Sequence, residues 1–387
     1  MLAKKELTWI SSFYMLFFMA GGVVSQYLPI FYSYRNYDYS KIGIILSIGS
    51  IFSVFFQPIA ATISDKVDKK IKVFRILIIS TFLTASFLFF LSRNYYYLLI
   101  VAGIFYGFSG CLQPLNDSII IEMCTRKNYK YQTIRLLGSL GFAIMSAITG
   151  VIASYNIVYI FPMYIGILII ALFISYHVPT VEKIKNEKVK SKFIELIHDK
   201  KFVFLLFYAF ILSITNAFFN SFQGIYSREN GISMGLLGIC SMIGSISQFP
   251  AMAFFSKAYK KFGQKKLMTT AGVVFGLRWL CYATILNSTS VLILWAIHGL
   301  TYILLFLCLV EYSRKNIPSQ LSTRALVLIN LILFGVSGII GSSLGGYFSN
   351  YLGIKNIFYI CSVICFLAVI FFNYYYKIYF TRKERIG

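Results

Sequence analysis

"GIILSIGSIFSVFFQPIAATISDKVDKK", residues 43–70, decides the class of fold. Its first part is apolar over about 20 residues, the length that a helix needs to cross a hydrocarbon core of about 30 Å. "SDKVDKK" then brings acidic and basic side chains into a short loop. The stretch is therefore typical of a transmembrane helix followed by a loop in water.

Composition extends this interpretation to the whole chain. Of the 387 residues 58% are hydrophobic and only 13% are charged, against about 25% charged in soluble domains. Because lipid-exposed backbone must be helical or belong to a closed barrel, we predict an all-α integral membrane protein with twelve transmembrane helices. The predicted spans lie near 8–32, 41–63, 73–91, 97–121, 136–154, 157–177, 202–226, 232–255, 267–287, 290–311, 326–348 and 357–379.

The net charge of +23 is distributed unevenly. If the N-terminus is cytoplasmic, all but six of the 36 Lys and Arg residues fall in the cytoplasmic segments. The exceptions are Arg35, Lys41, Arg93, Arg228 and Lys355 in outer loops and Arg278 inside a span. This is the positive-inside pattern, which predicts a protein of the cytoplasmic membrane with both termini in the cytoplasm. The charge thus reflects orientation in a lipid bilayer, and we expect no nucleic-acid partner.

The longest hydrophilic break, residues 177–201, divides the spans six and six. We expect an N-terminal six-helix bundle at 1–180, a cytoplasmic linker at 181–200 and a C-terminal six-helix bundle at 201–387. A parallel repeat of this kind places a substrate cavity between the halves.

Similarity between the two halves of the sequence supports the repeat. Gln57-Pro58 and Gln248-Phe249-Pro250 both lie late in the second span of their half. Each glutamine is followed twelve residues later by a pair of lysines.

Residues 43–70 also resemble the second helix and following loop of the major facilitator superfamily, in particular its lactose permease and phenylpropionate permease branches. Similarity continues through "YQTIRLLGSLGF" (131–142), "AGVVFGLRW" (271–279) and "IHGLTY" (297–302). The resemblance implies the major facilitator fold and a secondary transporter. It also implies a conformational-switch loop, whose acidic and basic positions are Asp65, Lys66, Lys69 and Lys70. Two glycines of the family's loop signature are replaced, by Ala61 and Asp68.

Asp117 lies within an apolar span, in "CLQPLNDSIII" (111–121). A charge at the bilayer centre costs at least about 2.5 kcal/mol, so it persists mostly where it faces a cavity or a partner. In the permeases that the chain resembles, an acid on helix four and an arginine eighteen residues later clamp the substrate, and Asp117 and Arg135 have this spacing. An arginine grips a carboxylate or two hydroxyls with parallel donors. By hydropathy alone, two other interpretations remain. Asp117 could form a structural ion pair with a neighbouring helix, and Arg135 could be an ordinary cation of a loop.

Arg278 and His298 form a second candidate pair, near mid-depth in the ninth and tenth spans. Alone, the arginine could stabilise packing and the histidine could be structural. The lactose permease family carries the same two residue types twenty positions apart in its coupling and binding region. The resemblance therefore implies substrate binding for Arg278. Because Thr301 and Ser245 stand where relatives have acids, the buried titratable candidates for proton coupling are chiefly His298 and Asp117, with Glu122 as a shallower one.

Departures from the family limit the choice of substrate. Acids of helices ten, eight and seven are replaced by Thr301, Ser245 and Asn216. The tryptophan that stacks on a galactose ring aligns with Phe142. A galactoside is therefore not expected, and Asn216 and Phe142 remain candidate substrate-binding residues.

Three further polar residues have simpler interpretations. Glu122 and Glu311 lie at the cytoplasmic ends of spans beside basic loops, so we expect them to form interfacial ion pairs. Gln26 is expected to join helices, as amides commonly do in membranes.

The function predicted from the sequence is secondary active transport of a small polar or anionic organic solute by alternating access, coupled to protons. An uncoupled facilitator, a drug or metabolite exporter and a non-transporting sensor remain alternatives. The chain shows no nucleophile and base pair, metal-ligand cluster or phosphate-binding glycine loop, so we expect neither an enzyme nor a cofactor. The expected partners are the solute and protons, and the expected state is a monomer.

Overall fold

The structure is a computed structural model that describes residues 2–67, 69–127, 129–179, 196 and 198–381. Helices account for almost all of this part of the chain, which contains no strand. The helices before the linker are α1 (Leu2–Val24), α2 (Tyr27–Tyr34), α3 (Tyr39–Lys66), α4 (Lys70–Phe90), α5 (Tyr95–Lys127), α6 (Tyr131–Tyr155), η1 (Ile157–Tyr159) and α7 (Ile160–Ser175). Those after it are α9 (Lys200–Glu229), α10 (Met234–Thr284), α11 (Ser288–Ala296), η2 (His298–Leu300), α12 (Tyr302–Asn316), α13 (Ser319–Asn330), η3 (Leu331–Val336), α14 (Ser337–Leu352) and α15 (Ile354–Thr381).

These helices supply the predicted spans. Within the described residues, ten helical segments are long and apolar enough to cross a membrane, and α11 with the segment 298–316 makes one more as a pair bent by 44°. The 51-residue α10 contains two spans, because the chain leaves the helical conformation at Gly263, where φ is 75° and ψ is 165°. The prediction of an all-α membrane protein is confirmed.

The element boundaries differ from the prediction in two respects. "KAYKKFGQKK" (257–266), expected as a loop, is helical on both sides of Gly263. Lysine, glutamine and alanine are good helix formers, and only the glycine adopts the positive φ that turns the chain. Unpredicted breaks interrupt the first span, between α1 and α2, and the tenth span, around His298. The predicted linker 181–200 lies outside the described residues except for 196 and 198–200.

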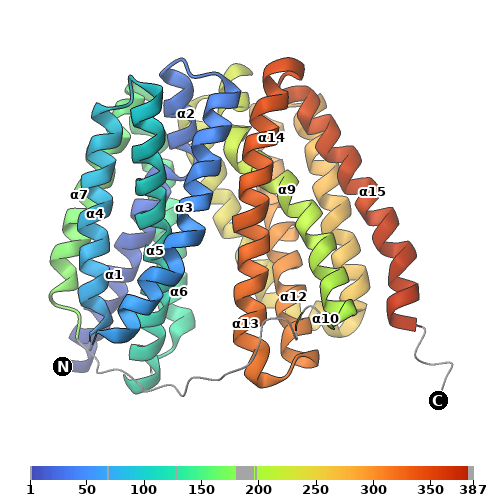
Figure 1. Cartoon of the computed structure of the whole chain (residues 1–387), viewed down its shortest axis with the longest axis horizontal. Helices are drawn as coiled ribbons and strands as arrows, with labels where there is room; N and C mark the ends of the chain where they lie inside the picture. The colour runs from blue at the N-terminus through green and yellow to red at the C-terminus, as the bar shows by residue number, and fades with distance from the viewer. Residues whose placement is uncertain (1, 68, 128, 180–195, 197, 382–387) are drawn as a thin grey trace.

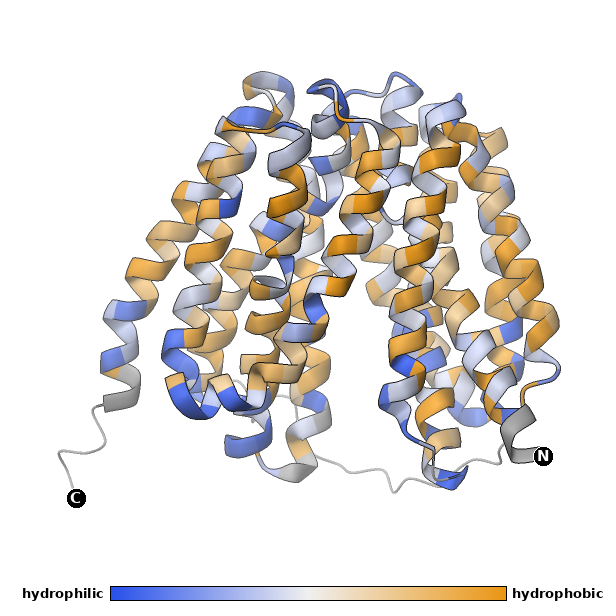
Figure 2. Cartoon of the chain, turned by 180° about the vertical axis from the view of Figure 1, so that it is seen from behind, coloured by the Kyte–Doolittle hydropathy of each residue, from blue (hydrophilic) through white to orange (hydrophobic). Residues whose placement is uncertain are grey.

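Two groups of helices lie side by side in Figure 1, α1–α7 on one side and α9–α15 on the other. We call the lower edge, where α1 begins and α15 ends, the basic end. Helices that run back from the other edge end here in basic residues, α3 in Lys66, α5 in Arg126 and Lys127, and α12 in Arg314 and Lys315. Figure 2 shows helices that are largely hydrophobic along their length and hydrophilic toward their ends. Toward the basic end the ribbons of the two groups diverge.

Close helix crossings join the two groups toward the other edge, which we call the opposite end. A Cβ atom added to Gly43 of α3 would overlap the backbone oxygen of Ser342 on α14. The matching crossing of α6 and α10 uses Gly150 and Gly238, where a Cβ at Gly150 would lie 2.6 Å from the oxygen of Met234. Small residues let helix backbones approach in this way.

Polar side chains reinforce the same contact. The Gln26 amide donates to the backbone oxygen of Leu237 at 3.0 Å and accepts from Ser241 at 2.6 Å. Ser47 and Ser342 lie with their hydroxyl oxygens 2.8 Å apart. The expectation that Gln26 joins helices is confirmed, and here it joins the two groups.

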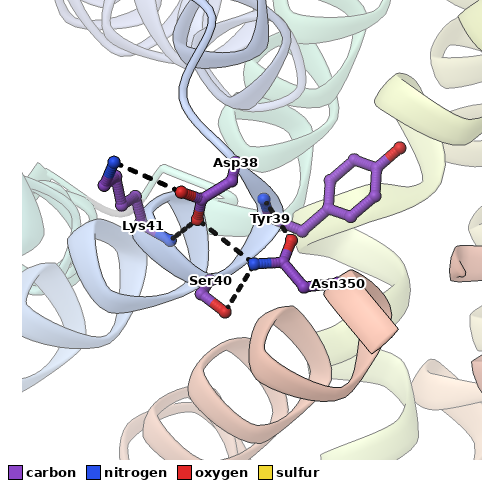
Figure 3. Close-up of polar contacts among 5 residues, drawn as sticks. All are labelled: Asp38, Tyr39, Ser40, Lys41 and Asn350. Atoms are coloured by element: carbon purple, nitrogen blue, oxygen red, sulfur yellow. Dashed lines mark hydrogen bonds and ion pairs between the residues drawn. The ribbon is translucent and has the colours of Figure 1, made fainter. Parts of the chain in front are cut away.

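At the opposite end, the side chain of Asn350, near the end of α14, forms hydrogen bonds with the start of α3 (Figure 3). Its Oδ1 accepts from the Tyr39 backbone at 3.0 Å and its Nδ2 donates to Ser40 at 2.9 Å. Asp38 caps α3 by accepting from the Lys41 backbone at 2.8 Å. The chain therefore holds this end closed with both packing and hydrogen bonds.

Candidate functional site

Asp117 is held by two tyrosines in the first group of helices. Tyr14 of α1 and Tyr131 of α6 donate to its Oδ1 at 2.6 and 3.2 Å. Arg135 Nη1 donates to the Tyr14 hydroxyl at 3.4 Å, and its guanidinium lies 4.6 Å from the centre of the Phe18 ring. Asp117 and Arg135 are thus linked through Tyr14, and the direct ion pair suggested by their spacing is not formed. We call these five residues the tyrosine-bridged cluster.

Tyr14 was not identified from the sequence, although it is central to this cluster. Its ring is completely buried and lies against Gly138 of α6, where a Cβ atom would come within 2.6 Å of it. The glycine therefore makes the room that Tyr14 occupies. Among 29 tyrosines in a chain rich in aromatic residues, no pattern distinguishes this one.

Arg278 of α10 lies at the centre of a second group of residues. It is completely buried, and its Nη1 is 2.9 Å from Nδ1 of His298. Because a guanidinium has donors only, Nδ1 must be the acceptor, so the ring is neutral and carries its proton on Nε2. Aromatic rings surround the cation, with centres 4.3 Å away for Phe219, 5.2 Å for Trp279 and 5.5 Å for Trp295. We call these five residues the arginine–aromatic cluster.

His298 owes its position to the break in the tenth span. The helix stops at Ala296, continues as the short η2 and starts again at Tyr302. Thr301 donates its hydroxyl to the His298 carbonyl at 2.5 Å, and the Gly299 backbone donates to Ser247 at 3.0 Å. Interrupted helices of this kind form the substrate and ion sites of many transporters.

Two asparagines lie buried near these clusters in sequence. Asn116, beside Asp117, has no exposed surface, and neither polar atom of its side chain has a partner in the described part of the molecule. Asn216 of α9 is 8% exposed and its Oδ1 likewise lacks a partner. Phe142 packs against α1, with its ring 3.7 Å from where a Cβ at Gly21 would lie.

The predicted switch loop connects α3 and α4. Asp65 and Lys66 end α3, Lys69 is the residue before α4 and Lys70 begins it. Lys70 donates to Ser118 at 2.9 Å, next to Asp117 on α5. The loop is thereby tied to the helix that carries Asp117.

The two expected interfacial ion pairs are confirmed. Glu122 lies 3.2 Å from Lys70 and 3.8 Å from Arg126. Glu311 lies 2.9 Å from Arg314 and 3.1 Å from Lys315. Within the described residues no group of three or more His, Cys, Asp or Glu residues is placed to hold a metal ion.

Comparison with known proteins identifies the family. The family model described as "MFS_1 like family" matches residues 7–360. The uncharacterized transporter YwbF of Bacillus subtilis (strain 168) is 26% identical over 371 residues, which cover 93% of this chain and 91% of that protein. The maltose permease of Geobacillus stearothermophilus is 23% identical over 380 residues, 95% of each chain.

The fold has a counterpart among solved structures. The crystal structure of the nucleoside transporter NupG has a TM-score of 0.84 and 14% identity, over 96% of this chain and 99% of that one. At this identity the match concerns the fold alone. The chain therefore belongs to the MFS_1-like family of the major facilitator superfamily and is a multi-pass membrane transporter, not an enzyme.

Proposed function

We propose that this transporter moves a small polar or anionic organic solute across the cytoplasmic membrane by alternating access, in symport with protons. The basic end faces the cytoplasm in this proposal, because cytoplasmic segments of membrane proteins carry the excess of Lys and Arg. Relatives named for maltose and a structural neighbour named for nucleosides support a small solute as the cargo.

The two groups of helices serve as the two moving bundles, residues 1–180 and 201–387. Support comes from the distribution of contacts between them, which include Gly43 with Ser342 and Asn350 with Tyr39 at the opposite end. The ribbons diverge toward the basic end (Figure 1). This arrangement corresponds to a state closed to the outside and open to the cytoplasm.

The solute site in this proposal lies between the bundles, with Asp117 and Arg135 on one wall and Arg278 and His298 on the other. Intramembrane charges mostly face such cavities. Asn216 and Phe142 contribute to the walls. The switch loop Asp65, Lys66, Lys69 and Lys70 transmits the movement of α3 and α4 to α5 through the Lys70–Ser118 bond.

The observation that carries the coupling is the bond from Arg278 Nη1 to His298 Nδ1 at 2.9 Å. While it exists, the lone pair of Nδ1 is occupied and the ring takes no second proton. A solute that draws the guanidinium toward itself frees Nδ1 to accept a proton, so solute and proton bind together. Asp117 is the second coupling group, because its Oδ1 accepts the hydroxyls of Tyr14 and Tyr131, and such bonds are stronger when the acceptor is charged.

Uptake into proteoliposomes tests this function. Purified protein is supplied with sugars, nucleosides, aromatic acids and drugs, with and without an inward proton gradient and with a sodium gradient as a separate arm. We expect a solute whose uptake is accelerated by the proton gradient. Equal accumulation with and without that gradient would overturn symport and favour an uncoupled or sodium-coupled carrier.

A further inference from the structure

The guanidinium of Arg278 uses only one of its edges. Nη1 bonds His298, whereas Nε and Nη2 have no partner among the described residues, although the side chain has no exposed surface. These two nitrogens form the side-on edge of the guanidinium, where two N–H groups point in parallel. That edge matches the two oxygens of a carboxylate.

No acid of the C-terminal half lies beside this arginine in the part of the chain that the structure describes. Between residues 200 and 381 the only acids are Glu229 and Glu311. Glu229 accepts from the Tyr39 hydroxyl at the opposite end, 2.5 Å away. Glu311 is paired with Arg314 at the basic end. A buried charge without a partner is strongly unfavourable, so Arg278 sits in a site that an anion would stabilise.

We propose that the transported solute carries a carboxylate and that Arg278 binds it through Nε and Nη2. This rests on the proposed transport function and narrows its substrate to organic carboxylates. Two further buried polar groups, Trp295 Nε1 and the Tyr282 hydroxyl, belong to rings around the same guanidinium, and neither makes a hydrogen bond of good geometry with another described residue. Because Arg278 is completely buried, a solute reaches this edge in the proposal only when the neighbouring helix moves, and the break between α11 and α12 beside His298 is where that helix can bend.

Thermal unfolding of the purified full chain tests the site, with probes that differ in charge but little in shape. The probes are benzoate against benzamide and gluconate against glucitol, with maltose as a neutral sugar, all at equal ionic strength. We expect a carboxylate to raise the Tm by about 3 °C near saturation. Its neutral counterpart leaves the Tm unchanged, and Arg278→Gln abolishes the shift.

Arg75 provides a matched control, because it is an arginine of α4 whose donors are used. It bonds the Ser175 hydroxyl at 3.0 Å and the Ser175 carbonyl at 2.7 Å. Arg75→Gln should lower the Tm of the empty protein and keep the carboxylate shift. Arg278→Gln should leave the Tm of the empty protein equal or higher, because it removes a buried charge that has no counterion.

Three results would overturn the proposal: no shift with either carboxylate, an equal shift in Arg278→Gln, or a lower Tm of empty Arg278→Gln than of the wild type. The proposed function is judged separately, by uptake. Proton-driven uptake of a neutral solute that survives Arg278→Gln would leave symport standing and remove the carboxylate site. If the proton gradient has no effect on uptake but a carboxylate still raises the Tm, symport is removed and the carboxylate site stands.

Discussion

Arg135, near the start of α6, and Arg278, within α10, are the arginines of the two clusters, yet their surroundings differ in one respect. Arg135 reaches a carboxylate of its own half through Tyr14, which bonds Asp117 at 2.6 Å and accepts from Arg135 at 3.4 Å. Arg278 reaches only the neutral His298 and aromatic faces. The tyrosine-bridged cluster thus pairs its arginine with a carboxylate, whereas the arginine–aromatic cluster leaves its positive charge unbalanced.

The difference assigns separate tasks to the two clusters. A balanced cluster keeps its geometry when empty, so the tyrosine-bridged cluster is suited to orienting a polar solute. An unbalanced cluster gains most from an incoming negative charge, so the arginine–aromatic cluster is suited to anchoring it. In the proposed mechanism, occupancy of the arginine–aromatic cluster determines whether His298 is free to bind a proton.

The largest effect is expected when the unbalanced charge is removed. Arg278→Gln should lower uptake of the transported carboxylate by at least about 100-fold, because it deletes two charge-assisted hydrogen bonds worth about 1.5 to 3 kcal/mol each. Uptake by proteoliposomes at matched protein content measures this. Arg75→Gln is the control, and a loss of similar size there would show that any intramembrane arginine is needed merely for folding.

The bridge in the other cluster should matter less. Tyr14→Phe removes the hydroxyl that bonds both Asp117 and Arg135, and we expect uptake to fall about 10-fold, as for loss of a hydrogen bond to a charged group. Tyr131→Phe removes only the longer 3.2 Å bond and should cost less. If the two variants behave alike, the bridge through Tyr14 has no special role.

A substitution that places an acid near the arginine–aromatic cluster tests the difference in charge between the two clusters. Asn216 is nearly isosteric with aspartate, its Oδ1 has no partner, and it lies one helical turn from Phe219, the ring closest to the Arg278 guanidinium. Asn216→Asp should raise the Tm of the empty protein by about 1 to 3 °C and lower carboxylate uptake several-fold, since the new acid competes for Arg278. A lower Tm together with unchanged uptake would mean that Asn216 faces away from the cluster.

The smallest effect concerns the contact that closes the opposite end (Figure 3). Partial burial raises the pKa of Asp38, but hydrogen bonds from the Lys41 backbone and the Asn350 side chain outweigh it, so the pKa is lowered. The stabilisation is then fully present above the ordinary aspartate range near 3.9 and is lost as the pH falls through the lowered value. External acidification should therefore favour opening of this end, by less than about twofold because the groups are exposed.

Spin-label distances across the opposite end measure that opening. Asp38→Asn should show the same distances at neutral and acidic pH. Asn350→Ala should open this end at every pH. A wild-type distance distribution that does not change with pH would remove Asp38 from the closing contact.

Much of the fold follows from the sequence, because crossing a bilayer imposes length and hydropathy on every span. Asp117 and Arg278 stand out in the sequence because a charge inside an apolar span is costly in lipid. Arg135 and His298 came from the family resemblance, and the role of all four residues in transport stays a prediction. The Tyr14 bridge could not be predicted, because the sequence pattern around a tyrosine that bonds charged residues is the same as that around a tyrosine that only packs in the core. The break at His298 was also missed. It lies inside an apolar stretch, and hydropathy predicts that such a stretch is in the membrane but not whether its helix is continuous.

Proton coupling through both clusters is the central claim, and one measurement tests it most directly. Uptake of the transported solute is followed in proteoliposomes with and without an inward proton gradient, for the wild type and for the double variant Asp117→Asn, His298→Gln. We predict that the gradient accelerates wild-type uptake and leaves the variant's residual uptake unchanged. Acceleration of equal size in the double variant would contradict the claim.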